Sequence, residues 1–373
     1  MSIKCAFLFP GQGSQAVGMG QDFFNNSDVA KQMVADATER TGINFENLLF
    51  EENNKLEKTE FTQPAILLVS AIAHKLFENE MPIKPVYALG HSLGEFSALV
   101  SVGAIDAIDA VELVNLRGKL MAEACAGQDV GMMVSLGLED KVVEEICDAQ
   151  REAGLKVWPV NYNAEGQIVI AGIKSDLEVL APLLKEAKAK RAMLLNMSVA
   201  SHCPLLESAT APLSEKLTEM LKDEFIAPVV SNVTANTYNT KEEALDLLPK
   251  QLVSPVLYKQ SIANFDDSVD CYVEFGHGGV LKGLNRKATT KPHFVVSDMA
   301  SLETAIEEIS KFYLNSAPLK TSLVENAKET LEHLALKYRL YIISNGFYDV
   351  QLTKVKNSGI SRYITKVFTS DRI

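Results

Sequence analysis

A serine stands between two glycines at residues 90–94, which read GHSLG. This order matches G-x-S-x-G, in which the glycines permit a tight strand-to-helix turn that projects the serine hydroxyl as a nucleophile. An apolar stretch at residues 86–89, expected to form a strand, precedes the motif, and a helix is expected from after Ser92 to about Gly103. The N–H of Leu93, at the helix start, would favour a developing oxyanion. The motif therefore predicts acyl chemistry at Ser92, unless this serine only caps the helix.

A nucleophilic serine needs a base, and the chain has six histidines. His202 follows an apolar stretch at residues 193–197, and its loop would lie at the sheet edge where α/β sites form. His277 lies in another exposed turn, residues 276–279, which read GHGG. Residue spacing alone does not decide which of these histidines is the base. Either could also be an ordinary histidine of a surface loop. We expect the turn to direct the His91 side chain away from the serine.

An arginine lies on the apolar face of a helix expected over residues 110–125. The residues three and four positions from Arg117 are all apolar: Leu113, Val114, Leu120 and Met121. A permanently charged guanidinium on this inward face needs a partner, and its planar fork suits a carboxylate. That partner would be either an internal Asp or Glu or the carboxylate of a substrate.

These side chains need a scaffold, and strands alternate with helices along most of the chain. A buried strand at residues 4–9 leads into a loop at 10–15, and helices are expected over 28–41 and 63–78. With the strand at residues 86–89, this order predicts a mostly parallel α/β sheet.

The middle of the chain follows a different order, strand–helix–strand–strand–helix–strand, which is the ferredoxin-like unit. The strands are expected over 132–136, 156–162, 168–171 and 192–197, and the helices over 139–153 and 175–189. We therefore expect a small subdomain, residues 126–198, inserted into a large α/β subdomain formed by residues 1–125 and 199–314.

Composition excludes several other classes of protein. The net charge of −12 disfavours a nucleic-acid-binding surface, which has to be basic. Five dispersed cysteines with no CxxC indicate neither a disulfide framework nor a zinc site. The longest apolar stretch, residues 65–73, is far shorter than the ~20 residues that span a bilayer. We expect a cytoplasmic monomer with no metal, no cofactor and no contact with membranes or nucleic acid.

Four segments, taken in order, carry a family resemblance. They read FPGQGSQ at residues 9–15, GHSLGEFSAL at 90–99, RG at 117–118 and SHCP at 201–204. Together they closely resemble the malonyl-CoA:acyl carrier protein transacylase family of bacterial fatty-acid synthesis, over residues 1–312. The resemblance implies an α/β-hydrolase-like large subdomain with an inserted ferredoxin-like small subdomain.

The resemblance also implies catalytic roles, and malonyl-CoA and acyl carrier protein as partners. Ser92 would be the nucleophile and His202 the base, oriented by an oxygen at the position of Gln251. The N–H groups of Gln12 and Leu93 would form the oxyanion hole. The implied reaction is a ping-pong transfer through a malonyl-serine. A serine hydrolase or thioesterase and a non-catalytic docking module are the alternatives, and the buried arginine speaks against the first.

Three further positions follow from the same resemblance. Arg117 would clamp the malonyl carboxylate, and Asn161 and Asn163 would lie on the coenzyme A side of the cleft. The chain departs from the family at His277 and Gly279, where proline and lysine are usual.

Acyl carrier protein is typically acidic, so docking requires a local basic patch. Two sets of basic residues are candidates: Lys188, Lys190 and Arg191, and Lys282, Arg286 and Lys287.

The C-terminal segment has a different character. Residues 315–318 are expected to form a linker, and residues 318–373 then carry nine Lys or Arg against five Asp or Glu. Residues 321–373 resemble a fragment of haloacid dehalogenase-type phosphatases, through the stretch LYIISNG at 340–346. No D-x-D motif precedes it in this segment, so we expect no phosphatase activity, which needs its Asp and Mg²⁺.

Overall fold

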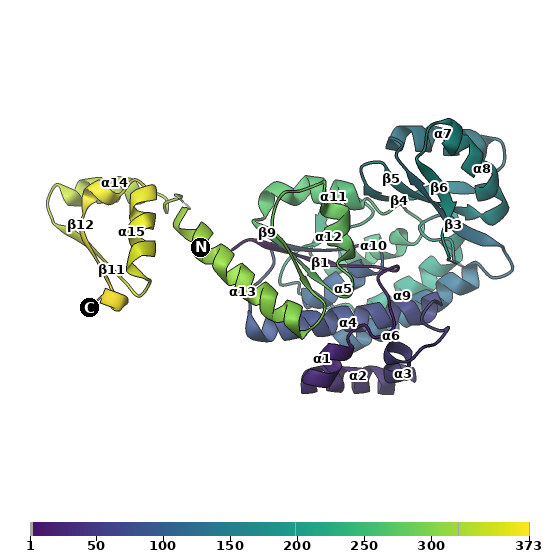
Figure 1. Ribbon diagram of the computed structural model, residues 1–373, viewed down its shortest axis with the longest axis horizontal. Helices are drawn as coiled ribbons and strands as arrows, with labels where there is room; N and C mark the ends of the chain where they lie inside the picture. The colour runs from purple at the N-terminus through teal and green to yellow at the C-terminus, as the bar shows by residue number, and fades with distance from the viewer. Residues whose placement is uncertain (1–2, 198, 320, 373) are drawn as a thin grey trace. The chain divides into compact units, whose positions relative to one another are not determined.

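The computed structural model describes residues 3–197, 199–319 and 321–372 (Figure 1). These residues form two compact units. One comprises Lys4–Glu303, and the other comprises Ile3 with the chain from Thr304 onward. Among the described residues, no helix combines the length and the apolar character needed to cross a membrane.

The larger unit is built on a six-stranded sheet with the order β10-β9-β1-β2-β7-β8. Its neighbouring strands run parallel except at one edge, where β7 and β8 are antiparallel. The prediction of a mostly parallel sheet is therefore confirmed. The strands are β1 (Cys5–Phe9), β2 (Tyr87–Gly90), β7 (Val229–Val230), β8 (Thr237–Tyr238), β9 (Cys271–Phe275) and β10 (His293–Val296).

The central strand, β1, explains why its sequence is apolar throughout. Alternate side chains of a strand point to opposite faces, and a parallel sheet is covered on both. Ala6 and Leu8 pack in one cluster with Ile262 of α11 (Tyr258–Phe265). Phe7 and Phe9 contact His74 of α4 (Thr59–Glu80) on the other face. All five β1 residues are consequently buried.

Two more helices position the candidate catalytic residues near the sheet. Helix α5 (Gly94–Ser101) follows β2 after a short turn and packs against β1 and β2. Helix α6 (Ala107–Ala124), which carries Arg117, packs along α4. Outside the inserted segment, the other described helices of four or more residues between Lys4 and Glu303 are α1 (Gln21–Asn26), α2 (Asp28–Thr41), α3 (Phe45–Phe50), a 3-10 helix (Pro204–Ala209), α9 (Thr210–Met220), α10 (Lys241–Gln251) and α12 (Val280–Asn285).

The inserted segment has the predicted strand and helix order. Its four antiparallel strands are arranged β4-β5-β3-β6, which is the ferredoxin-like order. Apolar side chains of its two helices pack against the sheet in one cluster. The elements are β3 (Val130–Leu136), α7 (Asp140–Glu152), β4 (Val157–Ala164), β5 (Gln167–Ile173), α8 (Lys174–Glu186) and β6 (Arg191–Leu194).

The smaller unit contains one two-stranded parallel sheet, β11 (Leu340–Ser344) with β12 (Ile364–Thr369). Helix α14 (Ala327–Ala335) precedes β11 along the chain, and helix α15 (Tyr348–Asn357) connects β11 to β12. The predicted linker at 315–318 is wrong. Helix α13 (Met299–Ser316) continues through Ser316, and a 3-10 helix covers Ala317–Leu319. Residues 299–316 contain no proline to interrupt a helix, and Pro318 follows the end of α13.

Candidate active site

Ser92 lies on a sharp turn between β2 and α5. Its φ of 52° lies in the left-handed region, which a serine rarely adopts. Side chains on the flanking glycines would collide with backbone: a Cβ on Gly90 would lie 1.8 Å from the carbonyl carbon of Gly94, and one on Gly94 would lie 2.0 Å from the oxygen of Phe9. The G-x-S-x-G pattern is thus a packing requirement as well as a turn.

A side chain from a distant segment stabilises this turn. Asn232 Oδ1 accepts a 2.7 Å hydrogen bond from the Ser92 N–H, and Asn232 Nδ2 donates at 2.7 Å to the oxygen of Gly90. One amide therefore bridges both ends of the strained turn. Sequence reasoning missed Asn232, because a lone asparagine in a loop carries no signal of its own.

The structure brings His202, and not His277, to the serine. His202 Nε2 lies 2.7 Å from Ser92 Oγ, and His202 Nδ1 lies 2.6 Å from the backbone oxygen of Gln251. Since a carbonyl can only accept, Nδ1 carries the proton and Nε2 is free to accept from the serine hydroxyl. Burial, and then the charge of Arg117, lowers the pKa of His202 to about 3. The imidazole is therefore neutral at physiological pH.

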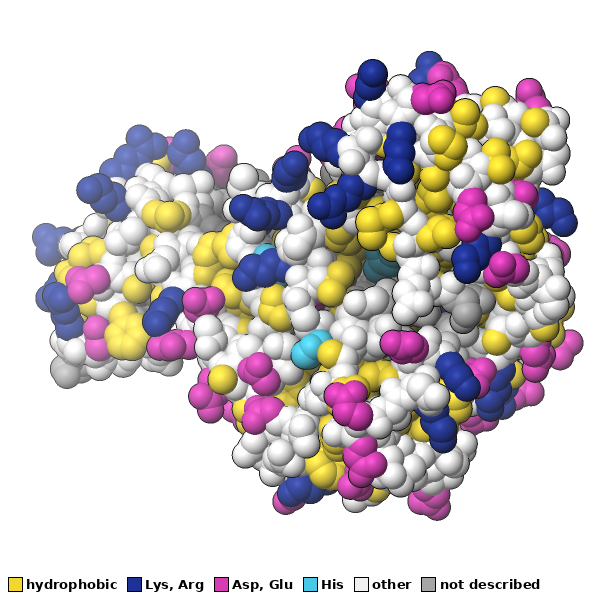
Figure 2. Space-filling model, turned by 45° about the vertical axis from the view of Figure 1, so that its right-hand side comes forward, with side chains coloured by type: hydrophobic (Ala, Val, Ile, Leu, Met, Phe, Trp, Pro, Cys, Tyr) yellow, Lys and Arg dark blue, Asp and Glu magenta, His cyan; other side chains and the backbone are white. Residues whose placement is uncertain are grey.

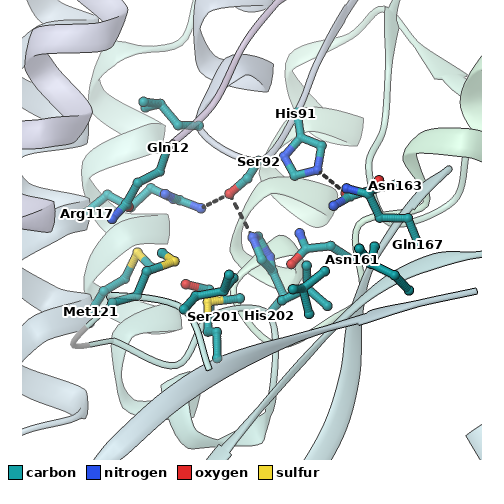
Figure 3. Close-up of a pocket in the computed structure, with 17 residues that line it drawn as sticks. Gln12, His91, Ser92, Arg117, Met121, Asn161, Asn163, Gln167, Ser201 and His202 are labelled. Atoms are coloured by element: carbon teal, nitrogen blue, oxygen red, sulfur yellow. Dashed lines mark hydrogen bonds between the residues drawn. The ribbon is translucent and has the colours of Figure 1, made fainter. Parts of the chain in front are cut away.

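Arg117 reaches the same point from helix α6 (Figure 3). Its Nη2 donates to Gln251 Oε1 at 2.9 Å and to Ser92 Oγ at 3.3 Å, and its Nη1 donates to Gln63 Oε1 at 2.7 Å. Within the described residues Arg117 makes no ion pair. The alternative of an internal Asp or Glu paired directly with Arg117 is therefore not observed. Burial lowers the pKa of Arg117 to about 10, which leaves the guanidinium charged at neutral pH.

A chain of hydrogen bonds links Arg117 to the loop after β1. Gln63 Nε2 donates to Thr59 Oγ1 at 2.9 Å, and Thr59 Oγ1 donates to Gln12 Oε1 at 3.1 Å. Sequence reasoning placed Gln63 and Thr59 only in or beside a helix and missed these hydrogen bonds.

The close approach of α6 to α4 depends on Gly118, because a Cβ there would lie 2.6–2.8 Å from backbone atoms of α4.

These side chains line a pocket of about 420 Å³ between the large sheet and the small subdomain (Figure 3). Its walls combine polar groups with an apolar side: Gln12, His91, Ser92, Leu93, Arg117, Met121, Met132, Val134, Leu136, Asn161, Asn163, Gln167, Val169, Leu195, Met197, Ser201 and His202. The pocket contains seven of the eight residues expected in the site. The eighth, Gln251, lies behind them, fully buried.

The other polar groups of the pocket differ in whether they have a hydrogen-bond partner within the described residues. His91 also lines the pocket, and its Nε2 lies 2.7 Å from Asn163 Oδ1, so its side-chain partner within the described residues is Asn163 and not Ser92. The backbone N–H groups of Gln12 and Leu93 donate to no atom of the described residues. Such free donors beside a nucleophile can bind an oxyanion.

Similarity to known proteins agrees with this geometry. The family model of the acyl transferase domain matches residues 6–308. The malonyl CoA-acyl carrier protein transacylase of Bacillus subtilis is 37% identical over 311 residues, which cover 83% of this chain and 98% of that protein. The crystal structure of the transacylase from Helicobacter pylori has a TM-score of 0.80 and 44% identity, covering 83% of this chain and 100% of that chain.

A further structural relative includes a partner. It is a type II PKS acyl-carrier protein in complex with its malonyl-transacylase, with a TM-score of 0.79, 37% identity and coverage of 82% of this chain and 99% of that chain. Because the family model matches most of the chain and these relatives are covered almost end to end, the chain belongs to the acyltransferase family of malonyl-CoA:acyl carrier protein transacylases.

Proposed function

We propose that this enzyme transfers the malonyl group of malonyl-CoA to the phosphopantetheine thiol of acyl carrier protein, through a malonyl-Ser92 intermediate. The observation that carries the proposal is a charged, fully buried guanidinium 3.3 Å from a serine hydroxyl that also contacts a histidine. A nucleophile beside a buried cation selects an acyl group that ends in a carboxylate. The hydrolase alternative has no comparable use for Arg117.

The acylation step needs a base and a place for developing charge. His202 takes the Ser92 proton on Nε2 as Ser92 Oγ attacks the thioester carbonyl. The N–H groups of Leu93 and Gln12 bind the tetrahedral oxyanion, and His202 then returns the proton to the leaving thiol of coenzyme A. The carrier protein's thiol reverses these steps.

Gln251 contributes a neutral oxygen to the histidine. The hydrogen bond from His202 Nδ1 goes to its backbone carbonyl, in place of the carboxylate of a serine protease. A neutral acceptor orients the imidazole while stabilising its protonated form less. The Gln251 side chain instead accepts from Arg117, which holds the clamp beside Ser92.

Substrate binding divides between the two walls of the pocket. Arg117 pairs with the malonyl carboxylate, beside Ser92. Asn161 and Asn163 lie on strand β4 of the small subdomain and line the same pocket, which supports their assignment to the coenzyme A side.

Docking of the acidic carrier protein requires basic residues outside the pocket. The two candidate sets, Lys188 with Lys190 and Arg191, and Lys282 with Arg286 and Lys287, are exposed. On the face shown in Figure 2, Lys and Arg side chains gather beside a hollow. Reversing the charges of whichever of the two sets docks the carrier protein should raise KM for the carrier protein without changing the rate of malonyl-Ser92 formation.

Mass spectrometry of the intact protein after mixing with malonyl-CoA tests the proposal. The expected result is a single malonyl adduct, located on Ser92 by peptide mapping and absent from Ser92→Ala. An adduct that persists in Ser92→Ala would overturn the assignment of the nucleophile. Release of free coenzyme A that continues without any acceptor thiol would indicate a hydrolase instead.

We also propose a cytoplasmic location, supported by five cysteines that are all unpaired. The proposed bounds are residues 1–125 and 199–314 for the large subdomain and 126–198 for the small one. The small sheet supports them, since its strands all lie between Val130 and Leu194. The monomeric state and the phosphatase-like character of residues 321–373 stay predictions.

A further inference from the structure

Glu95 is a buried acid directly beneath the nucleophile turn. It is the second residue of α5, and only 1% of its surface is exposed. Three groups donate to its carboxylate: Gln251 Nε2 at 2.6 Å, the Asn232 N–H at 3.1 Å and the Tyr238 hydroxyl at 3.1 Å. The proposed reaction gives Glu95 no role, yet it contacts two residues that hold the site together.

The first of these contacts has a fixed direction. A guanidinium can only donate, so the atom of Gln251 that faces Arg117 has to be its carbonyl oxygen. The amide nitrogen of Gln251 then faces Glu95 and also donates to the backbone oxygen of Ser92 at 3.1 Å. Glu95 has to accept at this position, and a carboxylate oxygen does so.

The second contact connects Glu95 to the nucleophile turn through Asn232. Glu95 Oε2 holds the backbone of Asn232, whose side chain bridges the N–H of Ser92 and the oxygen of Gly90. Through Gln251, whose backbone carbonyl holds His202, Glu95 also reaches the base. One carboxylate is thus one hydrogen-bonded residue away from the nucleophile, the base and the clamp.

The charge of Glu95 is opposite to that of Arg117, and no hydrogen bond or ion pair joins the two side chains within the described residues. The two charges attract, which raises the pKa of Arg117 and lowers that of Glu95, although burial dominates both. The Gln251 amide lies between them. A directly paired carboxylate would occupy the guanidinium, whereas this arrangement leaves Nη2 beside Ser92 Oγ, where a substrate carboxylate can reach it.

We propose that Glu95 is a positioning residue that aligns Ser92, His202 and Arg117 through Asn232 and Gln251, and that it supplies the separated countercharge of the Arg117 clamp. This inference rests on the proposed function, because it assumes that those three residues form and hold the malonyl-enzyme.

Two substitutions separate alignment from charge. Glu95→Ala removes every acceptor, and misplacement of reacting groups by about 1 Å costs about 10²-fold, so we expect a loss of that size in the rate of malonyl-Ser92 formation. Glu95→Gln keeps one oxygen for Gln251 and Asn232, while its amide faces the Tyr238 hydroxyl, which can turn to accept. We expect Glu95→Gln to recover the rate to within about tenfold of wild type.

The pH profile tests the charge itself. Burial raises the pKa of Glu95 to about 7, and the titratable and charged groups facing it are Tyr238 and Arg117. Protonation removes an acceptor, so wild-type acylation should fall as pH drops through about 7. This acid limb should be absent from Glu95→Gln, which cannot titrate.

The measurements are single-turnover malonylation between pH 5.5 and 8.5 and thermal unfolding of each full-length variant. Glu178→Gln is the matched control, because Glu178 is exposed on α8. If the acid limb of the pH profile is unchanged in Glu95→Gln, Glu95 is not the countercharge of Arg117. If malonylation is normal in Glu95→Ala, Glu95 does not align the site. If Glu95→Ala does not fold, the Glu95→Gln rate and profile decide. Absence of malonylation from wild-type enzyme would instead overturn the proposed function.

Discussion

Arg117 is held in the site by oxygens that carry no full charge. Its two Nη atoms donate to the amides of Gln63 and Gln251 and to the hydroxyl of Ser92, and its guanidinium carbon lies 5.2 Å from the centre of the Phe96 ring. Its Nε, also buried, has no hydrogen-bond partner among the described residues. Burying such a cation is costly, and an incoming carboxylate relieves that cost.

Arg117→Ala should therefore affect malonyl transfer selectively. Losing one side of a desolvated charge pair costs about 2–5 kcal/mol. At 1.36 kcal/mol per tenfold, kcat/KM for malonyl-CoA should fall by roughly 30- to several-thousand-fold. Acetyl-CoA has no carboxylate and leaves the parent Arg117 unpaired, so its transfer should fall far less or even rise. Parallel assays of the two thioesters measure the ratio.

Lys119→Ala serves as the control for this experiment, because Lys119 lies on the same helix but is exposed. It should leave both rates unchanged. Equal losses of malonyl and acetyl transfer in Arg117→Ala would mean that the arginine is structural.

The two candidate bases should differ sharply. His202→Ala removes the acceptor 2.7 Å from Ser92 Oγ, and general-base assistance contributes about 10²–10⁴-fold. His277→Ala should have a modest effect, because His277 does not line the pocket. Single-turnover malonylation followed by mass spectrometry measures both. A larger loss in His277→Ala than in His202→Ala would show that the base is misassigned.

At the scale of elements, the site depends on how closely α5 approaches β1 and how closely α6 approaches α4. Both approaches occur at a glycine, and in both a methyl group would meet backbone that cannot rotate away. Gly94 sets the first approach and Gly118 the second. These two contacts bring together Ser92, from the turn before α5, and Arg117, from α6.

Gly94→Ala should consequently destabilise the fold as well as the site. Its Cβ would lie 2.0 Å from the oxygen of Phe9, and overpacking of this kind costs about 1–3 kcal/mol or more. Thermal unfolding should show a lower midpoint, with malonylation lost. Gly283→Ala is the control: a Cβ there meets nothing within 4 Å, and alanine favours a helix over glycine by about 1 kcal/mol. An unchanged midpoint in Gly94→Ala would contradict this account of the turn.

At the scale of the whole molecule, every residue assigned to the reaction lies in the Lys4–Glu303 unit. The match to the acyl transferase domain model ends at residue 308, before the smaller unit's sheet begins at Leu340. The chemistry should therefore be independent of the C-terminal residues.

A chain ending at Leu314 should keep nearly all of its transacylase turnover, measured by malonyl transfer to carrier protein. Full-length protein should release no phosphate from phosphate esters in the presence of Mg²⁺. Phosphate release that disappears on truncation would reveal an additional activity in the smaller unit.

The sequence alone was sufficient for the features that depend on local pattern. The apolar run of β1, the G-x-S-x-G turn and the order of the ferredoxin-like insertion follow from periodicity and from glycine spacing, which act over a few residues. The one predicted linker was wrong because small polar residues at positions 315–316 can extend a helix as well as end it.

Only the tertiary structure decided which distant side chains meet. Residue spacing left His202 and His277 equal, and the family resemblance favoured His202. The fold then places His202 2.7 Å from Ser92 across 110 residues of sequence. Two of the partners of Arg117 are the side-chain amides of Gln63 and Gln251, and no local pattern marks either as its partner. Asn232 reaches the turn from 140 residues away. Such contacts depend on how helices and strands pack, and packing is a property of the whole chain that local spacing does not contain.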